Sequence, residues 1–61
     1  MQIGTVVRYR KKYPDGMKID WVGIVIDIST DHPNKHIQWV SEGAYGMRQW
    51  RHPSVLEVLC K

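Results

Sequence analysis

Short hydrophobic runs alternate with turn-forming residues along the whole chain. The β-branched and aromatic run at 5–11 predicts a first strand, and the turn sequence Pro14-Asp15-Gly16 lies in the loop, 12–19, that follows it. Further strands are expected at 21–28, 36–40, 47–51 and 55–59, with a single 3₁₀ turn at 52–54. Every window long enough for a stable helix contains a glycine or proline or lacks helical spacing. The pattern therefore predicts an all-β chain of five short strands.

The alternation of side chains within each strand assigns a core face. In the first strand, Val7 and Tyr9 point inward and the arginines point to solvent. In the second strand, the aliphatic residues at even positions share one face, so we expect that face in the core and Gly23 on the opposite side. The predicted core comprises Val7, Val22, Ile24, Ile26, Ile37, Trp39, Leu56 and Val58. Five such strands favour a closed or nearly closed barrel, because closure removes exposed sheet edges.

Length and composition restrict the class of protein. Sixty-one residues suffice for one domain, 1–61, and the apolar and charged fractions of 43% and 25% are typical of folded globular chains. Cys60 is the only cysteine, so an internal disulfide is excluded. A formal charge of +3 permits a polyanionic partner without requiring one. The sequence shows neither an apolar run of membrane-spanning length nor the features of a signal peptide, so we expect a cytoplasmic protein.

Four segments, in this order and spacing, resemble a known group of proteins. They are Gly4-Thr5-Val6-Val7-Arg8-Tyr9, Gly23-Ile24-Val25-Ile26, Ile37-Gln38-Trp39-Val40 and Val55-Leu56-Glu57-Val58-Leu59. With them the chain resembles the short SH3-like barrel proteins of tailed bacteriophages, marine ones especially, and more loosely the KOW, Tudor and CarD-type barrels. The resemblance implies a five-stranded SH3-like barrel with a 3₁₀ turn before the last strand. It also implies a viral protein that acts in the infected host cell or in the virion, and it supplies no activity.

The first strand departs from the pattern of peptide-binding SH3 domains. Those domains resemble one another in an acidic first loop that meets basic, proline-rich ligands. Here the corresponding stretch reads Arg8-Tyr9-Arg10-Lys11-Lys12-Tyr13 and is basic. We therefore do not expect recognition of a basic proline-rich peptide.

Metal binding and catalysis find little support in the sequence. His32 and His36 are four residues apart, but Pro33-Asn34 lies between them, so the spacing falls on a turn and not on a helix face. We interpret the three histidines as exposed loop residues and expect no metal and no cofactor. Cys60 is the penultimate residue, and so small a chain has little room for a substrate pocket. We therefore expect no catalytic residues and no enzymatic activity.

Exposed aromatic and basic residues remain as the candidate site. The chain has three Trp and three Tyr, and a small barrel cannot bury all six rings. We expect a protein-binding surface, because Trp, Tyr and Arg dominate interface hot spots. Its candidate residues are Tyr13, Trp21, Tyr45, Met47, Arg48 and Trp50. The partner would be a host protein, another viral protein or a second copy of the chain. The alternative is nucleic-acid binding, in which basic side chains meet phosphates and rings stack on bases, through Arg8, Arg10, Lys12, Arg48 and Trp50.

Overall fold

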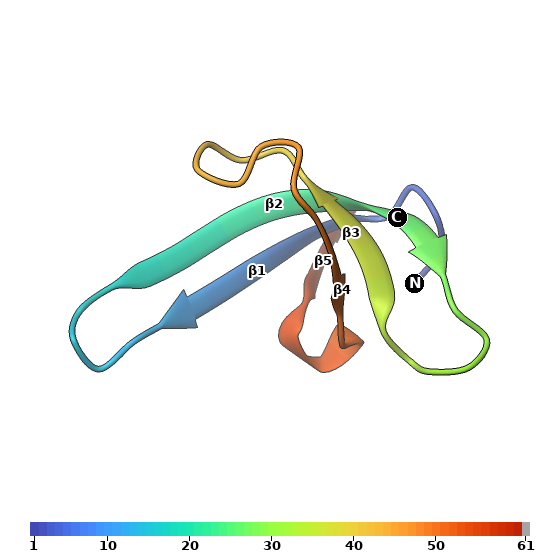
Figure 1. The fold of residues 1–61 in the computed structure, drawn as a ribbon, viewed down its shortest axis with the longest axis horizontal. Helices are drawn as coiled ribbons and strands as arrows, with labels where there is room; N and C mark the ends of the chain where they lie inside the picture. Colours follow the sequence, from blue (N-terminus) through green and yellow to red (C-terminus); the bar gives the residue numbers. More distant parts are fainter. Residues whose placement is uncertain (61) are drawn as a thin grey trace.

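Our computed structural model describes residues 1–60 (Figure 1). The chain folds into one antiparallel sheet of five strands, in the order β4-β3-β2-β1-β5. The strands are β1 (Val6–Lys12), β2 (Lys18–Ile28), β3 (Lys35–Trp39), β4 (Arg48–Arg51) and β5 (Glu57–Cys60), and a 3₁₀ turn, η1 (Pro53–Val55), precedes β5. The predicted all-β class and the 3₁₀ turn before the last strand are confirmed. The sheet is open: within residues 1–60 its edge strands β4 and β5 do not pair. No helix of those residues is long and apolar enough to cross a bilayer.

The β1–β2 hairpin is longer than the sequence pattern predicts. Strand β2 begins at Lys18 and not at Trp21, because Lys18 pairs with Lys12 and leaves only residues 13–17 as the loop. The Asp15 carboxylate accepts a hydrogen bond from the Met17 amide at 3.0 Å, as expected for this turn. The hairpin projects beyond the other strands (Figure 1), and the molecule measures 36 Å along its long axis against about 20 Å across.

One face of the sheet, which we call the inner face, carries the core. Its buried hydrophobic residues are Val7, Tyr9, Val25, Ile37, Trp39 and Ala44. Val7, Ile37 and Trp39 were predicted there, and Leu56 packs half-buried against them. Val58 was predicted in the core but is 42% exposed, because it lies on the short edge strand β5 and no further strand covers it.

The predicted core face of β2 is wrong. Val25 is fully buried and Gly23 is buried beside it, whereas Ile24 is 38% exposed and Val22 and Ile26 are only partly buried. The cause is the large indole of Trp39, which lies opposite Gly23 in the register. A Cβ at Gly23 would be 2.6 Å from Ile37 Cγ2 and 2.7 Å from Trp39 Cε3, so only glycine fits there. Val22 and Ile24 therefore belong to the opposite, outer face, and a register shift after Val25 pairs Ile28 with Lys35 on the inner face.

The loop between β3 and β4 folds back onto the sheet. Ala44 is buried in the core, and the Ser41 hydroxyl accepts a hydrogen bond from the Val22 amide at 2.7 Å. The Trp39 amide donates to the Met47 carbonyl at 2.9 Å and so continues the β3–β4 pairing beyond Arg48. The loop thereby covers one end of the core above Trp39.

We expect the reversed face of β2 to appear in a comparison of alanine variants. Val25→Ala leaves a cavity in the core and should lower the free energy of unfolding by about 2 kcal/mol. Ile24→Ala removes a partly exposed side chain from the outer face and should cost about 1 kcal/mol or less. Urea denaturation of the two variants checks this, and the opposite ranking would contradict the observed register.

Gly23→Ala should destabilise the protein although it adds only one methyl group. The new Cβ meets Ile37, Trp39 and a backbone oxygen, so we expect a loss of about 1–3 kcal/mol from overpacking. The measurement is the thermal midpoint by circular dichroism. Gln38→Ala, on the outer face of the neighbouring strand, serves as the control and should change the midpoint little. An unchanged midpoint for Gly23→Ala would show that Trp39 does not pack against this position.

Candidate interaction surface

Three aromatic rings form a cluster on the inner face that is only partly sealed. The ring centroids of Tyr9 and Trp21 are 6.3 Å apart, those of Tyr9 and Trp39 are 6.0 Å apart, and those of Trp21 and Trp39 are 5.5 Å apart. All three pairs are tilted, a geometry that aromatic pairs favour. Tyr9 and Trp39 are buried, but Trp21 is only partly covered. Part of the Trp21 side chain therefore remains accessible next to the buried rings of Tyr9 and Trp39.

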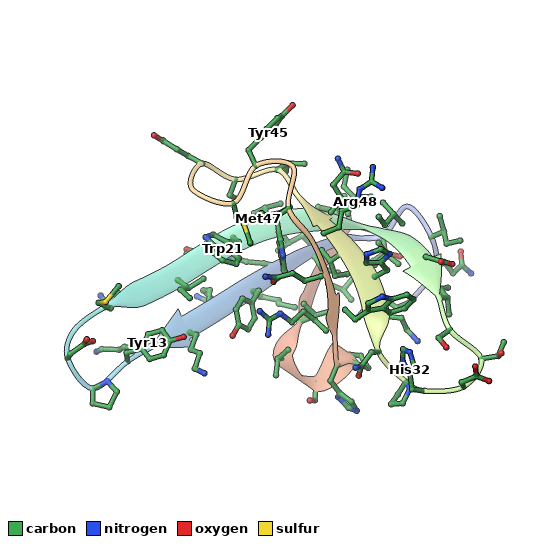
Figure 2. The ribbon with its side chains drawn as sticks, in the orientation of Figure 1. Tyr13, Trp21, His32, Tyr45, Met47 and Arg48 are labelled. Carbon is green, nitrogen blue, oxygen red and sulfur yellow. The ribbon has the colours of Figure 1, made fainter. Side chains whose placement is uncertain are left out.

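The apolar surface continues from Trp21 along the projecting hairpin. Ile19, directly opposite Lys11, is half-buried, and the Tyr13 amide beyond it donates to the Met17 carbonyl at 2.8 Å. Met17 is 64% exposed at the hairpin end. We call this surface the inner strip and define it by the following residues. They are Tyr9, Lys11, Tyr13, Met17, Ile19 and Trp21. Figure 2 shows Tyr13 near the tip of the hairpin and Trp21 farther along it.

The guanidinium group of Arg51 lies over Tyr9, at one end of the inner strip. Arg51 Cζ lies 5.1 Å from the centroid of the Tyr9 ring, which is the geometry of a cation–π contact. Gln49 Oε1 accepts hydrogen bonds from Arg51 Nε at 3.2 Å, from Arg51 Nη2 at 2.8 Å and from Trp39 Nε1 at 3.1 Å. At the other end of the strip, Lys11 Nζ lies 4.9 Å from the centroid of the Tyr13 ring. Both cations are thus held over rings.

The two faces of the sheet differ in how their charges are balanced. Within the strands that the structure describes, the inner face carries the cations Lys11, Lys35 and Arg51 and no acidic residue. The outer face carries five cations and three acids. They are Arg8, Arg10, Lys12, Lys18 and Arg48, with Asp20, Asp27 and Glu57. The inner face is therefore uniformly positive and the outer face is mixed.

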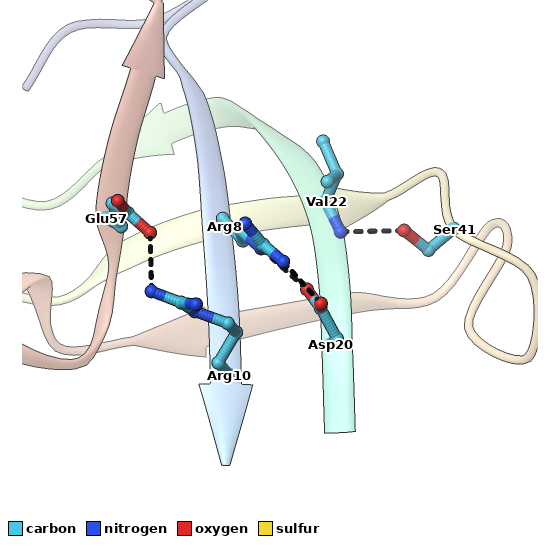
Figure 3. A network of polar contacts seen from close by, with 6 residues as sticks. All are labelled: Arg8, Arg10, Asp20, Val22, Ser41 and Glu57. Atoms are coloured by element: carbon cyan, nitrogen blue, oxygen red, sulfur yellow. Dashed lines mark hydrogen bonds and ion pairs between the residues drawn. The ribbon is translucent and has the colours of Figure 1, made fainter. Parts of the chain in front are cut away.

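Two ion pairs occupy the outer face of β1 (Figure 3). Arg8 Nε and Nη2 donate to the two carboxylate oxygens of Asp20 at 2.7 and 2.5 Å, and Arg10 Nη2 lies 3.3 Å from Glu57 Oε2. The hydrogen bond from Arg8 lowers the pKa of Asp20 below its ordinary value, and the same bond raises the pKa of Arg8. Arg8, Arg10 and Lys12 share one face as the sequence predicts, but two of the three are engaged by carboxylates.

The residues predicted to bind protein are distributed over both faces. Trp21 and Tyr13 lie in the inner strip, and Met47 lies on the same face by the alternation of β4. Arg48 and Trp50 lie on the outer face, opposite Gln38 and His36 respectively. Tyr45 is 81% exposed on the loop between β3 and β4 (Figure 2). The structure therefore places only Tyr13, Trp21 and Met47 on one face, with Tyr13 near the hairpin tip and Met47 at the loop between β3 and β4.

Trp50 lies in a small ring cluster of its own. The His36 ring stacks on it with centroids 4.6 Å apart and planes 8° apart, and His32 meets it edge-on at 5.1 Å. His36 is thus partly buried on β3, in agreement with the strand predicted at 36–40, and its interpretation as an exposed loop histidine is wrong. Among residues 1–60, no three His, Cys, Asp or Glu side chains gather closely enough to hold a metal ion.

Reasoning from the sequence missed Lys11, Gln49 and Arg51 as site residues. The position of Lys11 could have been predicted, because alternation along β1 places it on the same face as Tyr9. The position of Arg51 could not have been predicted, because it depends on a hydrogen bond to Gln49 and on the ring of Tyr9, which is distant in the sequence. Comparisons of the chain with protein-family models, with curated proteins and with solved structures found no match.

We expect the Arg8–Asp20 pair to contribute to stability in a pH-dependent way. Because the pKa of Asp20 is lower in the folded chain than its ordinary 3.8, its contribution is present above that pH and is lost as the pH falls through the folded value. Urea denaturation between pH 6 and about pH 2 should show that the free energy of unfolding falls more steeply on acidification in the wild type than in Asp20→Asn. Equal slopes for the two proteins would contradict a contribution from this exposed pair.

Proposed function

We propose that this protein is a non-catalytic binding module that attaches to another protein through its inner strip. The observation that carries the proposal is the unsealed aromatic cluster, in which Trp21 is left partly exposed beside two cations that rest on rings. Aromatic residues flanked by Arg are typical of interface hot spots, because they bury a large area and keep a polar group available. An apolar strip of this kind is expected to be covered by a partner.

We further assign the chain to the SH3-like barrels of phage origin. Support for the fold comes from the strand order β5-β1-β2-β3-β4 and from η1, which joins the two edge strands through the short segment 52–56. So short a connection requires the sheet to curl between its two edge strands. The phage origin rests on the resemblance of the sequence alone. Action in the infected host cell or in the virion follows from that origin.

The contrast between the two faces favours protein over nucleic acid as the partner. On the outer face, where the predicted nucleic-acid residues lie, Arg8 and Arg10 are engaged by Asp20 and Glu57. One face of the Trp50 ring is covered by the stacked His36. Phosphates would have to displace the carboxylates, and bases would find less of that ring available. The inner strip requires neither displacement.

Capture of a partner by face-specific variants tests the proposal. The protein is immobilised and exposed to lysate from infected cells, and bound proteins are identified by mass spectrometry. We expect a protein that binds the wild type to be lost on Tyr13→Ala/Met17→Ser, because these changes remove apolar surface from the strip without touching the buried core. Trp50→Ala, on the outer face, is the matched control and should retain the partner.

Two other results would overturn the proposal. A partner that survives the inner-strip variant but is lost on Trp50→Ala would place binding on the outer face. Fluorescence anisotropy with labelled DNA and RNA provides the other result. Micromolar binding that falls at least about tenfold between 50 and 200 mM salt, and is lost in Arg8→Ala/Arg10→Ala, would establish the nucleic-acid alternative.

A further inference from the structure

We infer that the inner strip binds an extended acidic segment of its partner, with two carboxylates that flank one apolar side chain. The inference rests on the proposed function and specifies the chemistry of the ligand. Its basis is the combination of two ring-held cations, the apolar surface between them and the absence of any acidic strand residue on that face among residues 1–60.

Arg51 is positioned to receive a carboxylate. Its Nε and one proton of Nη2 are used by Gln49, so both protons of Nη1 and the second proton of Nη2 remain available. These protons lie at the end of the guanidinium fork, which matches the two oxygens of a carboxylate. Gln49 accepts these bonds through an uncharged amide oxygen, and no side-chain carboxylate within residues 1–60 pairs with Arg51. Its charge is therefore held in place but not neutralised.

The second cation stands at a spacing that an extended peptide can match. Arg51 lies over Tyr9 on β1 and Lys11 Nζ lies over Tyr13, the first residue after β1, so the two rings are four residues apart in the sequence. Four residues of extended chain span about 13 Å, and side chains at alternate positions face the same way. A peptide aligned with β1 would therefore place carboxylates over the two cations from residues i and i+4.

The surface between the cations is apolar. Ile19, opposite Lys11, and Trp21, opposite Tyr9, are both half-buried on this face. Residue i+2 of an aligned peptide would lie against them, where a Leu, Val or Phe side chain would bury apolar area. The predicted ligand motif is thus an acidic residue, any residue, an apolar residue, any residue and an acidic residue.

The arrangement of cations and apolar side chains on the inner strip disfavours a nucleic acid as the ligand. Phosphates follow one another closely along a nucleic-acid strand, and its affinity comes from many phosphate contacts. The inner strip offers only two cations, over rings four residues apart in the sequence, and the apolar side chains Ile19 and Trp21 beside them attract no phosphate. A short acidic peptide satisfies both the charges and the apolar surface.

Selection from a random peptide display library tests this inference with the full chain as bait. We expect enriched peptides to carry Asp or Glu at i and i+4 around an apolar residue. A synthetic peptide of the enriched sequence should bind at least about tenfold more weakly to Lys11→Gln/Arg51→Gln, because two charge-assisted contacts are lost. The control is Lys12→Gln/Arg48→Gln, which removes the same charge from the outer face and should change binding by less than about twofold.

The position of the bound peptide is read by ¹H–¹⁵N nuclear magnetic resonance. The indole signal of Trp21 on the inner face should shift, and that of Trp50 on the outer face should not. Enriched peptides that are neutral or basic, or equal weakening by the two double variants, would overturn the acidic ligand and leave the proposed function standing. A library that yields no peptide would overturn a linear segment as the ligand. Capture by the Tyr13→Ala/Met17→Ser variant decides the proposed function independently of these outcomes.

Discussion

The close approach of Trp39 to Gly23 decides which side of β2 joins the core, and the arrangement of both faces follows from it. Ile37 and Trp39 fill the space that a Cβ at position 23 would occupy, at separations of 2.6 and 2.7 Å. Val25 is then carried into the core and Ile24 to the outer face. Because side chains in paired strands share faces residue by residue, this one contact also fixes the orientation of β1, where Val7 lies opposite Gly23.

The distribution of charge is a consequence of the same register. Alternation along β1 sends Arg8 and Arg10 to the outer face, where Asp20 and Glu57 stand within reach of them. It sends Lys11 to the inner face, where its ammonium group lies over the ring of Tyr13. A ring attracts a cation without cancelling its charge, whereas a carboxylate neutralises it. The two faces therefore differ: on the outer face Arg8 and Arg10 are paired with carboxylates, and on the inner face Lys11 and Arg51 lie over rings and can still bind an anion.

Much of the strand pattern could be predicted from the sequence, but the face of its longest strand could not. The turn at Pro14-Asp15-Gly16 and the buried positions Ile37 and Trp39 follow from local chemistry and alternation. The four aliphatic residues of β2 give a stronger periodic signal than Gly23 and Val25 do, yet a ring on another strand overrides it. The early start of β2 at Lys18 likewise depends on its pairing with β1, which no property of a polar stretch reveals. The candidate site could likewise not be predicted in full, because the position of Arg51 depends on its contacts with Gln49 and Tyr9.

The open side of the aromatic cluster links binding to stability. A domain of this size buries a limited core, so leaving Trp21 and Ile19 half-exposed costs free energy that the free protein does not recover. The two cations leave these side chains uncompensated, because their charged groups lie over the rings of Tyr9 and Tyr13 instead. A ligand that lies on the strip completes the burial and also neutralises the charges. Any such ligand must stabilise the fold as it binds, in proportion to the logarithm of its concentration over its dissociation constant. Ile19 and Trp21, which the free domain leaves partly exposed, are in this way the residues through which a partner would stabilise it.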